Sequence, residues 1–165
     1  MSKLIALGLT LAGLVAFAAA PSSLALAVDE INATPGRTIQ GAGLAVHGFD
    51  PVAFFAQGRP LIGSAKYAVV HDGATYRFAS AANMKIFQSS PNQYVPAFGG
   101  YCSYGVAVGA KFDGDPRYWK IVDGKLYLTL NEQIQETWLQ DVPGNIRKAK
   151  KNWTQIKHKD PSDLG

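Results

Sequence analysis

Cysteine is nearly absent from this chain of 165 residues, which contains Cys102 alone. A single cysteine cannot form an internal disulfide, so Cys102 must be a buried thiol, a metal ligand, a reactive thiol or a bridge to another chain. The chain also lacks H-x-x-x-H and C-x-x-C spacings, and it has no G-x-x-x-x-G-K loop to hold phosphate. Any metal or catalytic site must therefore be assembled by the fold from distant segments.

Charge is missing from the stretch between Leu4 and Ala20, which follows Lys3 and is rich in Leu and Ala. Ala25-Leu26-Ala27 then places small residues where signal peptidase accepts them. The stretch reaches only the short end of the roughly 17–25 residues that a bilayer span needs. Acidic residues follow it, with no basic stop-transfer cluster. We therefore predict a cleavable signal peptide over residues 1–27, a periplasmic or secreted chain, and no stable membrane span after cleavage.

Acidic residues are scarce at the other end of the chain. Residues 143–165 contain six Lys or Arg against two Asp, whereas residues 28–142 contain nine basic and ten acidic side chains. A basic segment can face nucleic acid or an anionic membrane, or can be the solvated side of a terminal helix. A helical stripe of apolar residues is formed by Ile146, Ala149, Trp153 and Ile156. The lysines fall largely off this stripe. We therefore expect a solvated helix face and no nucleic-acid partner.

Two Asp-Gly pairs predict β-hairpins, because each lies between β-prone segments and glycine tolerates the positive φ of a tight turn. They are residues 72–73, between 66–71 and 75–78, and residues 123–124, between 118–122 and 125–128. Helices are predicted after the caps Ser80 and Asn131 and from Pro143 onward. The expected class is α+β, with a small antiparallel sheet built from the two hairpins and packed with about three helices.

The predicted organisation has one domain. Residues 28–45 are expected to form an N-terminal linker, residues 46–158 the domain, and residues 159–165 a C-terminal tail. No internal repeat is evident in the sequence.

Three segments carry a family signature: residues 46–55 with Asp50-Pro51-Val52, residues 76–94 beginning Tyr-Arg-Phe-Ala-Ser, and residues 99–107 around Cys102. With the segments behind them, they resemble the YHS-domain family in its exported bacterial branch, over residues 44–153. This resemblance implies a metal-binding ancestry based on cysteines. At those cysteine positions this chain holds Ala53, Ala79 and Asn83. None is a thiolate, so the cysteine site of the family is absent.

Two side chains remain as candidate metal ligands, Cys102 in a glycine-rich loop and His47 before Asp50-Pro51. A thiolate suits Cu(I) or Zn(II), and imidazole is the commonest protein ligand for metals. We expect a YHS-type binding domain, not an enzyme, that takes a copper or zinc ion through Cys102 and His47 or meets a protein partner. Two alternatives stay open: a thiol-based redox protein or enzyme using Cys102, and a structural or interaction module without metal.

Overall fold

The structure of this chain is a computed structural model that describes residues 30–34, 38–39 and 41–164. The predicted signal peptide over residues 1–27 and part of the predicted linker lie outside the described residues. No helix in the described part of the chain is long and apolar enough to cross a membrane.

Both predicted hairpins are present. The first joins β2 (Ser64–His71) to β3 (Ala74–Phe78), and the second joins β4 (Asp115–Val122) to β5 (Lys125–Thr129). At each turn the Asp and the Gly both have positive φ, 47° and 79° in the first and 49° and 71° in the second, as a type I′ turn requires. The α+β class is confirmed. The two hairpins lie in separate sheets and do not build one sheet as expected: the first sheet has the order β1-β3-β2, with β1 (Gly43–Leu44) parallel to β3, and the second consists of β4 and β5.

The three predicted helices are also present, and each begins at a capping side chain. They are α3 (Ala81–Ser89), α6 (Glu132–Leu139) and α7 (Val142–Ile156). Ser80 accepts the backbone N–H of Asn83 at 3.1 Å, and Asn131 accepts that of Ile134 at 2.9 Å, so both predicted caps are confirmed. Further short helices complete the fold: α2 (Ala53–Ala56), α4 (Pro91–Tyr94), α5 (Ser103–Ala107), η1 (Val46–Gly48), η2 (Ala97–Gly100) and η3 (Pro161–Leu164).

The chain folds as two halves with a similar order of elements, although no repeat is evident in its sequence. The first half (residues 46–94) runs η1, α2, hairpin, α3, α4, and the second half (residues 97–139) runs η2, α5, hairpin, α6, so that only α4 has no counterpart. Strand pairing repeats at a constant offset of 51 positions, from Ser64↔Phe78 to Asp115↔Thr129, and the register shifts at the same place in both hairpins. Little beyond the Asp-Gly-x-x-Tyr pattern of the turns is shared in sequence, so the likeness appears only in the fold.

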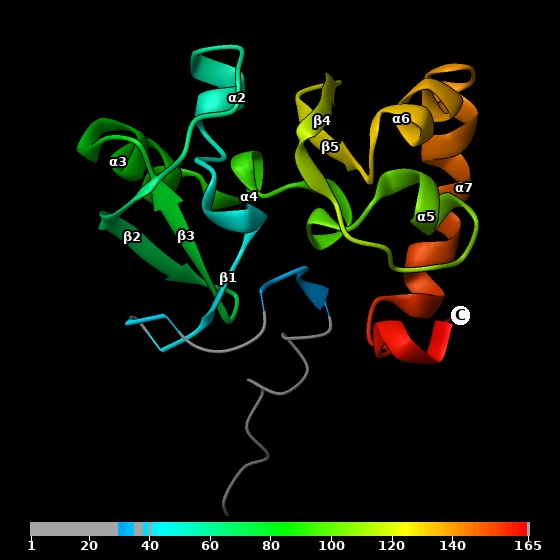
Figure 1. The fold of residues 1–165 in the computed structure, drawn as a ribbon, viewed down its shortest axis with the longest axis horizontal. Helices are drawn as coiled ribbons and strands as arrows, with labels where there is room; N and C mark the ends of the chain where they lie inside the picture. Colours follow the sequence, from blue (N-terminus) through cyan, green and yellow to red (C-terminus); the bar gives the residue numbers. More distant parts are fainter. Residues whose placement is uncertain (1–29, 35–37, 40, 165) are drawn as a thin grey trace, which may run out of the picture.

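Two hydrophobic cores meet at β5. Side chains alternate across a strand, and in β5 Leu126 and Leu128 join the core of the first half while Tyr127 joins the core that α5 and α7 cover. In Figure 1 the β4–β5 hairpin accordingly lies between the three-stranded sheet and α7. The two halves are thus packed around one shared strand.

Residues just before the first half tie the halves together. The expected linker over residues 28–45 contains β1, and its Asn32 donates its backbone N–H to the carbonyl of Gly99 at 2.9 Å. A Cβ on Gly99 would lie 1.7 Å from the carbonyl oxygen of Glu30, so this approach requires glycine. Glu30 also pairs with His158 at 2.8 Å. The segment beginning at Glu30 is therefore packed on the second half.

Candidate functional site

Asp50 is the buried capping residue of the first half. Its side chain has no exposed surface, and Oδ1 accepts the backbone N–H groups of Val52 and Ala53 at 2.9 and 3.2 Å. Oδ2 accepts the backbone N–H of Ala79 at 2.8 Å and the side-chain amide of Asn83 at 2.6 Å. Four donors on one carboxylate offset the cost of burying it.

Three of these four donors belong to residues at which the resemblance to the YHS family leads us to expect cysteines. Ala53, Ala79 and Asn83 all contact the same Asp50 carboxylate, so the fold brings the three positions together. Two of them have no ligand atom on the side chain, and the amide of the third donates to Asp50. A metal held in the manner of the family does not fit these residues, and a hydrogen-bonded carboxylate fills the place instead.

Cys102 is the corresponding capping residue of the second half. Its Sγ accepts the backbone N–H of Gly105 at the start of α5, at 3.4 Å, and those of Tyr104 and Leu130 also point to it. Leu130 stands in the second half where Ala79 stands in the first, immediately before the cap of the next helix. The side chain is 1 % exposed.

The electrostatics of this thiol follow from that position. Burial raises the pKa of Cys102, and the negative charge of Asp113 raises it further, while the three backbone N–H groups act in the opposite direction. Burial is the largest cause, so the neutral thiol is favoured at neutral pH. A thiol in this state is poorly nucleophilic.

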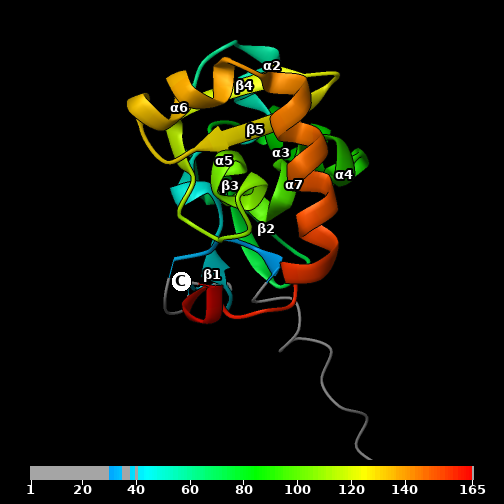
Figure 2. The ribbon, with the colours of Figure 1, turned by 90° about the vertical axis from the view of Figure 1, so that its right-hand side faces the viewer.

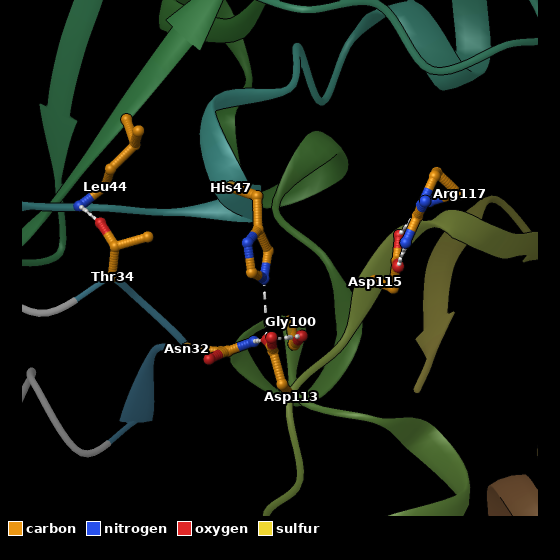
Figure 3. Close-up of polar contacts among 8 residues, drawn as sticks. All are labelled: Asn32, Thr34, Leu44, His47, Gly100, Asp113, Asp115 and Arg117. Atoms are coloured by element: carbon orange, nitrogen blue, oxygen red, sulfur yellow. Dashed lines mark hydrogen bonds and ion pairs between the residues drawn. The ribbon is translucent and has the colours of Figure 1, made fainter. Parts of the chain in front are cut away.

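His47 lies at the surface, in a left-handed backbone conformation that is uncommon for residues other than glycine. It has φ 50°, between Val46 at 52° and Gly48 at 78°, and its side chain is 38 % exposed. Nε2 lies 2.8 Å from Oδ1 of Asp113; since a carboxylate only accepts, the imidazole donates. Figure 3 shows the ring pointing toward Asp113.

Asp113 is held in place by a residue of the N-terminal segment. The side-chain amide of Asn32 donates to Oδ1 of Asp113 at 2.6 Å and to the carbonyl of Gly100 at 3.2 Å. A second acid lies nearby: the pKa of Asp115 is lowered mainly by its hydrogen bonds with Arg117, and the charge of His47 contributes. His47 therefore faces one restrained carboxylate and lies within electrostatic range of another.

The two residues predicted to share a metal take different places in the fold. Cys102 caps a buried helix and His47 faces Asp113 at the surface, and Asp113 influences both. Among residues 30–34, 38–39 and 41–164, no group of three or more His, Cys, Asp or Glu side chains is arranged to hold a metal ion. A joint Cys102–His47 site stays a prediction.

Asp113 and Asn32 escaped the sequence analysis. Asn32 lies in the expected linker and no motif contains Asp113; Asp113 contacts His47 across 66 positions of sequence, and Asn32 contacts Gly100 across 68. No local spacing signals such contacts.

Comparison of the chain with family models, with curated proteins and with solved structures gives no match. The geometry described above therefore carries the functional argument.

Proposed function

We propose that the chain is an exported, non-enzymatic binding domain of the YHS type that binds a transition-metal ion, copper(II) or zinc, at His47 and Asp113. The observation that carries this proposal is the backbone of η1. In η2 the three residues with positive φ are Phe98, Gly99 and Gly100, and a glycine stands where η1 has His47.

A left-handed conformation costs a non-glycine residue about 1 kcal/mol or more. The first half carries this cost at two successive residues, one of them the β-branched Val46, where glycine would remove it. The conformation directs the His47 imidazole toward Asp113. Strain that is kept at an exposed polar side chain supports a binding role for that side chain.

The chemistry of the pair suits a borderline metal ion. Imidazole nitrogen and carboxylate oxygen are both ligands for Cu(II) and Zn(II), and the metal would replace the proton between Nε2 and Oδ1. Asn32 would orient the carboxylate through its hydrogen bond, as residues that hydrogen-bond to metal ligands do in known sites. Two protein ligands leave the other coordination positions to water or to a group on a partner, which favours exchange of the ion over permanent storage.

Calorimetric titration of the exported form with Cu(II) and with Zn(II) tests the proposal. We expect one ion per chain, with affinity reduced at least about ten-fold in His47→Ala and in Asp113→Asn, and about ten-fold in Asn32→Ala. His158→Ala is the matched control, because His158 is 50 % exposed and pairs with Glu30 at the same 2.8 Å but has no positive φ.

Two results would contradict the proposal. One is the absence of binding of either ion, and the other is binding that His47→Ala and His158→Ala weaken equally. Cys102→Ser separates this site from the predicted joint site: it should leave the affinity unchanged here, whereas a ligand thiol would make it fall.

A further inference from the structure

The exposed side of α7 carries four cations and no acid. Arg147, Lys148, Lys150 and Lys151 are all exposed, and the residues from Val142 to Ile156 include no Asp or Glu. Successive helical residues are 100° apart, so these four occupy one continuous arc, which we call the basic face. None of the four takes part in an ion pair within the described residues.

The opposite side of α7 is fully engaged. Ile146, Ala149 and Ile156 are buried, and the Asn152 amide donates to the carbonyls of Val106 and Ala107 in α5 at 3.1 and 3.0 Å. The helix therefore cannot roll its apolar stripe into a membrane, and only the basic face is open to a partner. Figure 2 shows α7 running along the side of the molecule that is turned toward the viewer.

We propose that this basic face docks the protein electrostatically on an anionic phospholipid bilayer. The basic face shares no residue with the His47–Asp113 site. Lysine and arginine near an anionic bilayer each contribute to binding, and a cluster of four to eight of them is the usual recognition unit. Here four are presented by one rigid helix, and the rest of the mature chain before residue 143 has an almost balanced charge.

The shape and composition of the face favour a bilayer over nucleic acid. Single-stranded nucleic acid is bound with aromatic stacking platforms in a basic groove, and the other exposed residues of α7 are Pro143, Thr154 and Gln155, none of them aromatic. The one aromatic residue of α7, Trp153, packs inward against Phe98 and Tyr101. The predicted export also takes the chain to where the periplasmic or outer surface of a bilayer is the polyanion it meets.

Co-sedimentation with vesicles tests the proposal. The exported form is mixed with vesicles of phosphatidylcholine alone or with phosphatidylglycerol added, at low salt and at high salt. We expect binding only to the anionic vesicles, lost at high salt. Replacing Arg147, Lys148, Lys150 and Lys151 by Gln should weaken it by about five-fold per charge, at least about a hundred-fold in all.

The matched control changes net charge equally but on other surfaces. It replaces Arg59, Lys66, Lys85 and Lys120, all exposed and outside α7, by Gln. The proposal stands if this variant sediments like the parent chain, and circular dichroism shows whether both variants are folded. Equal loss in both variants, no binding to anionic vesicles, or binding to an oligonucleotide in place of vesicles would overturn it. None of these results depends on metal binding at His47.

Discussion

The two halves of the molecule place different chemistry at the same capping position. In the first half a carboxylate, Asp50, receives four hydrogen bonds; in the second a thiol, Cys102, receives backbone N–H groups alone. The side chain of Asn83 supplies the extra donor in the first half, and Ile134 stands at the corresponding position of the second. One fold thus supports a buried anion where a side-chain amide assists and a neutral thiol where none does.

The comparison first predicts unequal costs of removing the two caps. Asp50→Ala leaves four donors without an acceptor and should lower the free energy of unfolding by about 3–5 kcal/mol. Cys102→Ala, the matched change, removes a weak acceptor and should cost about 1–2 kcal/mol. Urea denaturation followed by circular dichroism measures both values. Equal losses would show that the two positions are not energetically distinct.

A second test converts one capping position into the other. Cys102→Asp buries a carboxylate that lacks the amide donor, and we expect a loss of about 2 kcal/mol. Adding Ile134→Asn supplies a donor at the place of Asn83, so the double variant should recover about 1 kcal/mol relative to the sum of the single changes. A double-mutant cycle of unfolding free energies measures this coupling; a coupling of zero would mean that the halves are alike in backbone only.

The smallest effect concerns the pH dependence of Cys102. Because burial raises the thiol pKa in the folded chain, its contribution to stability is complete below the ordinary thiol value of about 8.5 and is lost as pH rises through the folded value. Iodoacetamide should therefore modify Cys102 slowly at neutral pH and faster only above pH 8.5. Rapid alkylation at pH 7, retained in the folded state, would instead support the thiol-enzyme alternative.

Local signals made the hairpins and the long helices predictable. An Asp-Gly pair between β-prone residues and a Ser or Asn before an apolar helical stripe act over a few residues, and Asp72-Gly73, Ser80 and Asn131 behave accordingly. The candidate site was harder to predict from the sequence. His47 was identified from its residue type, but its partner Asp113 lies 66 positions away, and a long-range contact has no local pattern.

The role of Cys102 was hidden for a different reason. Cysteine is not among the usual N-cap residues, so nothing in the sequence marks it as one. The similarity of the two halves could not be predicted from the sequence, because they share a backbone path and few side chains. The short strand β1 was hidden as well, because its two residues lie in a stretch without strand periodicity.

The contact between Glu30 and His158 constrains the order of events in biosynthesis. Glu30 leaves the ribosome long before His158 does, so this ion pair can form only when nearly the whole chain has been made, whereas Asn32 can already meet Gly99 once about two thirds of the chain is present. The ion pair between Glu30 and His158 would therefore be among the last tertiary contacts to form.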